Sequence, residues 1–264
     1  MTRASLDPRS FYALSNARQI PLLGFGVYEL EQGGEAEECI LWALQAGYRH
    51  FDTASLYGNE VSVGNAIRKS GIPRNQIFVT TKLWDDDQGY ESALEACDLS
   101  LEKLGLDYID LYLIHSPSCG AELRRESWKA LEKLVTQGKV KSIGVSNYGV
   151  QHLKELLGSN PTIRPVVNQI ENIAIAAYSP LTRGLKLQEP TLVKIAHKYG
   201  KSTAQVLIRW SLQKGYVVLP KSSNKARIEQ NADVFDFDIA DGDMATLDSF
   251  NENMTMEWDP TLAP

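Results

Sequence analysis

Short apolar runs alternate with amphipathic segments along most of the chain. The apolar runs are rich in Val, Ile and Leu, as the buried strands of a parallel sheet are. The amphipathic segments have a helical repeat and several end in glycine, which favours a helix C-terminus there; they span residues 36–47, 90–105, 126–138 and 202–215. The apolar runs lie at residues 21–29, 48–54, 77–84, 109–117, 142–147, 165–171, 173–181 and 216–223.

This alternation of strand and helix predicts a parallel sheet covered by helices. Eight units predict an α/β fold, the parallel eight-stranded (β/α)8 or TIM barrel, with residues 1–264 as a single domain. The rival is a doubly wound open sheet, which requires a glycine-rich phosphate turn after its first strand. Gly24-Phe25-Gly26 lacks the third glycine of that turn. Residues 14–22 suggest a short hairpin that closes the barrel floor, and residues 250–264 suggest a short tail.

One connection of the predicted barrel is too short. A single residue separates the runs that end at Glu171 and begin at Ile173, yet these runs should be neighbouring parallel strands. A parallel crossover needs about a dozen residues and is usually a helix. Either a helix-sized segment is absent from this sequence between Glu171 and Asn172, or the deletion is real and breaks or reroutes the barrel. The first is favoured, because a closed barrel that loses the crossover between its sixth and seventh strands should be severely destabilised.

Composition limits which binding partners and which cellular compartment are expected for this protein. The chain has 264 residues and a formal net charge of -6, which argues against nucleic acid or an anionic membrane surface as its main partner. Three cysteines without metal-ligand spacing suit a reducing compartment. The N-terminus lacks the apolar core of a signal peptide, and no run approaches the roughly 20 apolar residues of a membrane span. A cytoplasmic protein is therefore expected.

Polar residues stand where most of the predicted strands end. The carboxyl ends of barrel strands meet at one mouth, where active sites are built. An apolar core would exclude most of these residue types, so their position predicts a functional site. They are Asp52 with nearby Tyr57, Lys82, His115, Ser146 with Asn147, Gln169 with Glu171, Tyr178 and Lys221.

Four of these residues suit a proton relay. A free phenol is a poor proton donor at neutral pH, but an adjacent ammonium stabilises its phenolate, so Lys82 is expected to lower the pKa of Tyr57. Asp52 would keep the buried lysine charged. His115, as a neutral donor, would hold a carbonyl oxygen beside Tyr57. Together they would deliver a proton to an oxygen that becomes an alkoxide.

Other readings of the same residues are weaker. A glycosidase pair of Asp52 and Glu171 would place its carboxylates on opposite sides of the barrel and leave Lys82 without a role. No metal is expected, because His115 has no histidine or carboxylate partner at ligand spacing. His50 is expected to pack one step deeper than Asp52 rather than to react.

The chain resembles the aldo-keto reductase family, and its microbial and fungal members in particular. The resemblance runs from about Gly24 to Phe237, interrupted at the short connection after Glu171. It is carried in order by "GFGVYEL", "YRHFDTASLYGNE", "IFVTTKLW", "DLYLIHSP", "IGVSNY", "NQIE", "AYSPL" and "LPKSSNKARIEQN". It implies NADPH-dependent reduction of aldehydes and ketones to alcohols by hydride transfer. The catalytic residues that it implies are Asp52, Tyr57 as general acid, Lys82 and His115.

The resemblance also implies a binding site for NADPH or NADP+. Ser146, Asn147 and Gln169 would hold the carboxamide, and Tyr178 would stack on the nicotinamide ring. The segment "PKSSNKARIEQN" gathers cationic and neutral donors that suit a ribose 2′-phosphate, although Gln230 replaces the glutamate of many relatives. The full set of implied cofactor contacts is Gly26, Val27, Tyr28, Asp52, Ser146, Asn147, Gln169, Tyr178, Ser179, Leu181, Lys221, Ser222, Ser223, Asn224, Arg227, Gln230 and Asn231.

The substrate pocket is expected to have aromatic walls, which favour apolar or flat carbonyl compounds. Its predicted lining is Tyr28, Trp84, His115, Cys119 and Trp258. The leading hypothesis is a monomeric or weakly dimeric NADPH-dependent carbonyl reductase that acts on small molecules. Two alternatives stay open: a cofactor-binding, redox-sensing subunit similar to potassium-channel β subunits, and a catalytically impaired relative that truly lacks the crossover.

Overall fold

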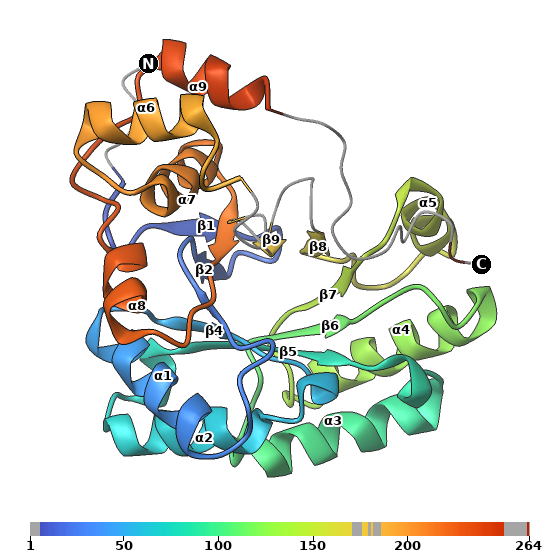
Figure 1. Cartoon of the computed structure of the whole chain (residues 1–264). Coiled ribbons are helices and arrows are strands. Elements are labelled where there is room, and N and C mark those ends of the chain that lie inside the picture. The colour runs from blue at the N-terminus through green and yellow to red at the C-terminus, as the bar shows by residue number, and fades with distance from the viewer. Residues whose placement is uncertain (1–5, 171–175, 179–180, 182–185, 251–262, 264) are drawn as a thin grey trace.

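The computed structural model describes residues 6–170, 176–178, 181, 186–250 and 263. In this part of the chain, eight parallel strands form one curled sheet in the order β10-β9-β8-β7-β6-β5-β4-β3, with helices around it (Figure 1). The strands are β3 (Phe25–Gly26), β4 (His50–Asp52), β5 (Phe78–Leu83), β6 (Leu111–Ile114), β7 (Ile143–Ser146), β8 (Asn168–Ile170), β9 (Ala176–Tyr178) and β10 (Val217–Leu219). An antiparallel hairpin of β1 (Phe11–Ala13) and β2 (Gln19–Pro21) precedes them.

Backbone contacts join the first and last strands of the sheet. Leu23 forms a parallel bridge with Val218, and the Gly24 amide donates to the Val218 carbonyl over 2.9 Å. Gly24 permits this closure because a Cβ there would lie 2.6 Å from Nδ1 of His50 and 2.6 Å from a methyl carbon of Leu219. The predicted (β/α)8 barrel is thereby confirmed, with strands shorter than the apolar runs.

The helices cover the outside of the sheet. Successive pairs pack against one another from α6 through α7, α8, α1, α2 and α3 to α4, and the helix faces turned inward carry residues such as Ile40, Val63 and Leu131, all fully buried. The helices are α1 (Gly34–Gln45), α2 (Glu60–Ser70), α3 (Tyr90–Leu104), α4 (Ala121–Thr136), α5 (Val150–Gly158), α6 (Pro190–Tyr199), α7 (Thr203–Gln213), α8 (Lys225–Ala232) and α9 (Asp241–Asp248).

Helix ends follow local sequence signals. Ser202 and Gln205 form a capping box at the start of α7, which satisfies amides that a helix start leaves unpaired. Gly105 ends α3 in the left-handed conformation with φ 61°, where glycine has no side chain to strain. These local devices fix the lengths of the helices that cover the strands.

The short connection lies between β8 and β9. These strands are parallel neighbours, with Gln169 opposite Ala176, and only residues 171–175 join them. Five residues are too few for a crossover helix, and residues 171–175 lie outside the described part of the chain. The β8–β9 pairing is nevertheless retained in the sheet. In the helical layer, α5 and α6 stand far apart (Figure 1).

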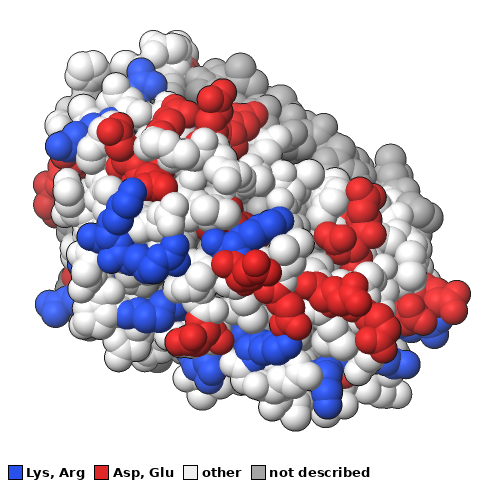
Figure 2. Space-filling view, turned by 90° about the horizontal axis from the view of Figure 1, so that it is seen from below, with Lys and Arg blue, Asp and Glu red and all other residues white. Residues whose placement is uncertain are grey.

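The surface carries charges of both signs. Figure 2 shows acidic and basic side chains lying beside one another over the face seen from below. Ion pairs link neighbouring elements, as between Lys69 of α2 and Glu37 of α1. In the residues described, no helix is long and apolar enough to cross a membrane.

Candidate active site

Four polar residues converge at the carboxyl ends of neighbouring strands. Asp52 ends β4, Lys82 lies near the end of β5, and His115 directly follows β6. Tyr57 ends the short 3-10 helix at Ser55–Tyr57 that follows β4. Three parallel strands therefore bring together groups that lie far apart in the sequence, as their positions predicted.

Lys82 is the centre of this group. Its ammonium nitrogen donates to Oδ1 of Asp52 over 2.6 Å, to the Thr53 carbonyl over 2.9 Å and to the Tyr57 hydroxyl oxygen over 3.2 Å. An ammonium has three N–H donors, so these contacts use all of them. Lys82 is fully buried, and its position is fixed by an acid, a carbonyl and a phenol together. The phenol accepts this bond, which leaves its own proton to be donated elsewhere.

Asp52 is held from a second side by β8. Nε2 of Gln169 donates to Oδ2 of Asp52 over 2.8 Å, so both carboxylate oxygens are engaged. The sequence assigned Gln169 to a cofactor and gave no sign of this contact, because it joins residues 117 positions apart. The Gln169 carbonyl accepts from the Ser146 hydroxyl over 2.9 Å, and Nδ2 of Asn147 donates to the His115 carbonyl over 2.9 Å. The predicted carboxamide-binding residues thus form one network with the predicted catalytic residues.

Burial and charge set the protonation of the group. Burial alone would lower the pKa of Lys82, but Asp52 and Tyr57 outweigh it and hold that pKa above its ordinary value. Burial raises the pKa of the Tyr57 hydroxyl, and the charge of Lys82 opposes this rise without cancelling it. Lys82 does lower this pKa, as expected, but the loss of water around the phenol is the larger effect, so the net pKa lies above its ordinary value. The result is a neutral phenol beside a charged lysine.

His115 is a neutral histidine at the inner end of the mouth. Burial, reinforced by the charge of Lys82, lowers its pKa to about 3. Its ring lies edge-on to Tyr57, with ring centres 5.6 Å apart, and edge-on to Trp84 at 5.1 Å. Among the described residues, its buried Nδ1 has no hydrogen-bond partner. His115 therefore combines a neutral ring with direct contact to the phenol.

His50 is a packing residue, as its position on the strand indicated. It is 1% exposed, its Nε2 lies 3.0 Å from the Thr80 hydroxyl, and its ring packs edge-on against Phe78. Its contacts place it within the barrel, below the group around Lys82.

Aromatic side chains surround the mouth. Tyr28 is 44% exposed, and its ring centre lies 4.9 Å from that of Tyr57. Trp84 is half-buried against His115. Cys119 lies in the loop after β6, where its thiol contacts the Asp85 carbonyl at 3.5 Å and burial raises its pKa to about 11. Trp258 lies outside the described residues.

The segment predicted to bind the adenosine end of a cofactor lies at the start of α8. The Asn224 side-chain oxygen accepts from the Arg227 amide over 3.1 Å and so caps the helix, while the Asn224 amide donates to the Ser222 hydroxyl over 3.1 Å. Nζ of Lys221 reaches the Glu29 carbonyl at 3.5 Å. The segment from Ser223 to Arg227 is exposed. A helix N-terminus flanked by exposed cations can accept a phosphate group.

The remaining predicted cofactor residues have varied settings. Val27 is fully buried, so only its main chain could reach a ligand. Gly26 faces the Leu219 carbonyl, which a Cβ would approach to 3.3 Å. Gln230 is exposed, Asn231 is buried and Leu181 is partly buried. Ser179, the side chain of Tyr178, and Glu171 of the rejected glycosidase pair lie outside the described residues.

Two further residues support the mouth and were not singled out from the sequence. The Thr53 hydroxyl donates to Oδ1 of Asn59 over 2.8 Å, and Nδ2 of Asn59 donates to the carbonyls of Val27 and Leu30 over 2.8 and 3.0 Å. These bonds fasten the β3 and β4 ends to the start of α2. Both residues lie within "RHFDTASLYGNE", and the presence of two polar residues in a buried motif was the only sequence signal for this supporting role.

No cluster of three or more potential metal ligands is found among the described residues.

Comparison with known proteins places this geometry in a family. The model of the Aldo/keto reductase family matches residues 22–175 and 163–252. This chain belongs to the aldo-keto reductase family. The family that the sequence motifs predicted is thereby confirmed.

Two curated relatives cover almost the whole of this aldo-keto reductase chain. A 9,11-endoperoxide prostaglandin H2 reductase of Trypanosoma cruzi is 47% identical over 267 residues, which cover 94% of this chain and 93% of the relative. Glyoxal reductase of Bacillus subtilis is 45% identical over 257 residues, with 91% and 92% covered. A solved aldo-keto reductase structure from Bombyx mori, in complex with NADP, has a TM-score of 0.86 and 36% identity, and 94% of each chain is covered.

The comparisons bear on the short connection. The alignment to the trypanosomal reductase has 267 positions, but it includes only 94% of the 264 residues of this chain, which is about 248 residues. About 19 positions of the alignment are therefore gaps in this chain. The family match is also split in two, with both parts overlapping near residues 163–175. The number of gap positions and the place where the family match divides both fit a gap of about the length of a crossover helix near the short connection.

Proposed function

We propose that this chain is an NADPH-dependent reductase of small aldehydes and ketones, with Tyr57 as the general acid. The observation that carries the proposal is the Lys82 ammonium, which bonds Asp52 and the Tyr57 hydroxyl at once. Two relatives, a glyoxal reductase and a prostaglandin H2 reductase, support reduction as the reaction. A family member solved with NADP supports the cofactor.

Each side chain would have its own role at the substrate oxygen. A carbonyl oxygen between the Tyr57 hydroxyl and His115 would accept hydrogen bonds from both, since neutral His115 can donate one N–H. As negative charge develops on that oxygen, Tyr57 gives up its proton to it. The fixed Lys82 charge stabilises the phenolate that remains, and Asp52 keeps Lys82 charged throughout.

The residues present fit a nicotinamide cofactor. Amide and hydroxyl groups of Ser146, Asn147 and Gln169 stand beside Asp52 and His115, and exposed cations stand at the start of α8. The first group would hold the carboxamide, and Lys221 with Arg227 the 2′-phosphate. When bound, the cofactor supplies a hydride to the carbonyl carbon. Tyr28, Trp84, Cys119 and Trp258 would line the substrate mouth around His115.

The test is a turnover assay with a matched pair of variants. Oxidation of NADPH, followed by its absorbance, is expected with glyoxal and with a simple aromatic aldehyde. Tyr57→Phe should lower kcat on the order of 100-fold or more, because general acid catalysis contributes about that factor, while NADPH binding is retained. Tyr12→Phe, on the exposed hairpin, should have no effect. An unimpaired Tyr57→Phe chain, or no turnover across a broad carbonyl panel, would overturn the proposal.

A second candidate is a relative that binds the cofactor but turns over poorly. The observation in its favour is the lost crossover, whose flanking strands carry Gln169 and Tyr178, both assigned to the nicotinamide. In that case NADPH should raise the midpoint of thermal unfolding, since it binds the folded form, whereas the aldehyde panel gives no turnover.

A further inference from the structure

Two loops at the mouth are tied together by a buried serine and an acid. The Ser116 hydroxyl lies 2.7 and 2.6 Å from the two carboxylate oxygens of Asp85, and Ser116 is 2% exposed. Nε2 of Gln88 donates to Oδ1 of Asp85 over 3.1 Å and to the Ser116 carbonyl over 2.9 Å. A hydroxyl bond to a charged acceptor is among the stronger hydrogen bonds of proteins. We call Asp85, Gln88 and Ser116 the loop clamp.

The loop clamp joins the residues that follow two walls of the mouth. Asp85 follows Trp84 after β5, and Ser116 follows His115 after β6. The rings of Trp84 and His115 meet edge-on, with centres 5.1 Å apart. The clamp therefore joins the backbone beside each ring, in addition to the bond that the His115 amide donates to the Leu83 carbonyl over 3.0 Å.

The far side of the same loop is also fixed. Nη1 of Arg124 donates to the Pro117 carbonyl over 2.5 Å, and its Nε and Nη2 bind the carboxylate of Glu155 over 3.1 and 2.7 Å. Arg124 is 4% exposed. α4 and α5 thus hold the loop from behind, whereas the loop clamp and the Cys119 thiol on the Asp85 carbonyl hold it toward Trp84.

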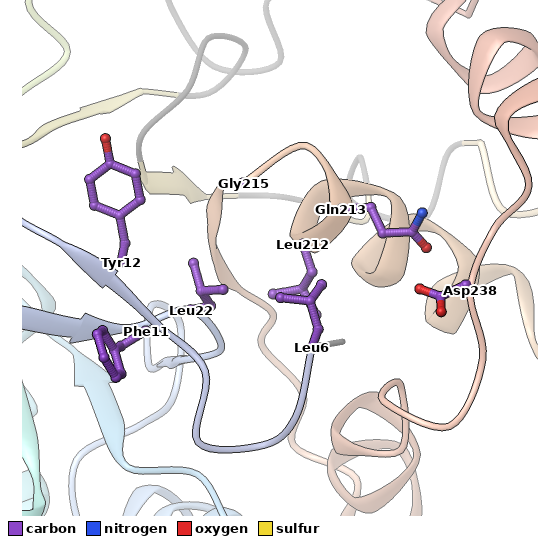
Figure 3. Close-up of a pocket in the computed structure, with 8 residues that line it drawn as sticks. All are labelled: Leu6, Phe11, Tyr12, Leu22, Leu212, Gln213, Gly215 and Asp238. Atoms are coloured by element: carbon purple, nitrogen blue, oxygen red, sulfur yellow. The ribbon is translucent and has the colours of Figure 1, made fainter. Parts of the chain in front are cut away.

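The hollow beside the hairpin is not proposed as a ligand-binding site. Figure 3 shows it lined by residues such as Leu6, Leu22 and Leu212 near the start of β3 and the end of α7, at the opposite end of the strands from Lys82. Its polar Gln213 is engaged with Arg209 and with the main chain of Ile239. Nothing in its lining calls for a ligand.

We propose that Ser116 and Asp85 are positioning residues that hold Trp84 against His115 and thereby set which carbonyl substrates fit the mouth. This inference rests on the proposed reductase function and adds the residues that shape its substrate wall. A substrate with a bulky flat group would lie against Trp84, whereas a small dialdehyde would need only Tyr57 and His115. The clamp should therefore act on bulky substrates and spare small ones.

The test compares Ser116→Ala with two other variants in the full chain. Loss of a hydrogen bond to a carboxylate should lower kcat/KM for an aromatic aldehyde on the order of tenfold, mainly through KM, with glyoxal turnover and the Kd for NADPH changed less than about twofold. Asp85→Asn keeps an acceptor oxygen and should lie between the wild type and Ser116→Ala. Ser142→Ala is the matched control, since Ser142 is equally buried and bonds Asn16 over 3.0 Å at the far end of the barrel.

A second measurement does not depend on turnover. The emission of Trp84 is obtained as the difference between each chain and its Trp84→Phe counterpart. It should shift to longer wavelength in Ser116→Ala, because the ring is no longer held against His115, and should not shift in Ser142→Ala. Unchanged emission, or an equal loss for both aldehydes, would overturn the positioning role. An inactive wild type whose Trp84 emission still responds would instead reject the reductase function and keep the clamp.

Discussion

Replacement of Lys82 by methionine is the sharpest stability test of the buried group. Lys82 and Asp52 form an ion pair whose side chains are 1% and 5% exposed. Breaking a buried pair by removing one partner costs about 3–5 kcal/mol, because the other charge stays buried without compensation. Methionine fills nearly the same space, so a cavity adds little. The charge left on Asp52 is the main term.

The structure places the expected cost at the lower end of that range. Asp52 keeps its bond from Gln169 over 2.8 Å, which satisfies one carboxylate oxygen after Lys82 is lost. We therefore expect Lys82→Met to lower the free energy of unfolding by about 3 kcal/mol. Adding Asp52→Asn removes the uncompensated charge, so the double variant should be more stable than Lys82→Met alone. This non-additivity is the signature of direct coupling.

Urea unfolding followed by circular dichroism measures these differences. Lys139→Met is the control, because Lys139 pairs with Asp98 at side-chain exposures of 35% and 55%, and exposed pairs contribute about 0–1 kcal/mol. The buried-charge reasoning would be refuted if Lys82→Met lowered the free energy of unfolding by less than about 1 kcal/mol. It would also be refuted if the double variant lost more free energy of unfolding than the sum of the losses in the two single variants.

Three further outcomes are expected. Burial lowers the pKa of His50 to about 4 from its ordinary 6.5; the unfolded chain binds this proton first, so stability should fall as pH drops from 6.5 to 4, by about 3 kcal/mol, and His50→Gln should remove that part of the slope in urea titrations. Gly64→Ala should prevent folding or cost more than about 3 kcal/mol, because its Cβ would lie 1.8 Å from the Leu104 carbonyl oxygen, whereas Gly242→Ala meets nothing within 4 Å and should retain full stability in the same assay. Insertion of the crossover segment of a relative at residues 171–175 should raise the midpoint of thermal unfolding; an unchanged midpoint would mean that the missing helix contributes nothing.

Much of the fold could be predicted from the sequence because each barrel strand leaves a local pattern in it. Buried parallel strands appear as apolar runs, and their polar ends mark the mouth, so Asp52, Lys82 and His115 could be placed near one another before any contact was known. The short connection could also be seen in the sequence, because one apolar run ends at Glu171 and the next begins almost at once. The sequence did not show that β8 and β9 would still pair, since that pairing depends on the whole sheet rather than on the connecting residues.

The protonation of the site depended on burial. The sequence indicated that Lys82 would lower the pKa of Tyr57, which is the correct sign for a neighbouring charge. The opposing loss of hydration is larger, and its size depends on how many elements pack around the phenol. A sequence carries the identity of the charges but not the amount of water removed from them.

By itself the sequence determined the barrel, the family, and the group of Asp52, Tyr57, Lys82 and His115, because each rests on short motifs and on the repeat of strand and helix. Only the tertiary structure decided that Gln169 holds Asp52, that Asn59 fastens the loop after β3 to the loop after β4, and that Ser116 clamps Asp85. These hydrogen bonds join loops from different strands, and their geometry is set by barrel closure. No local pattern encodes which loop ends will meet.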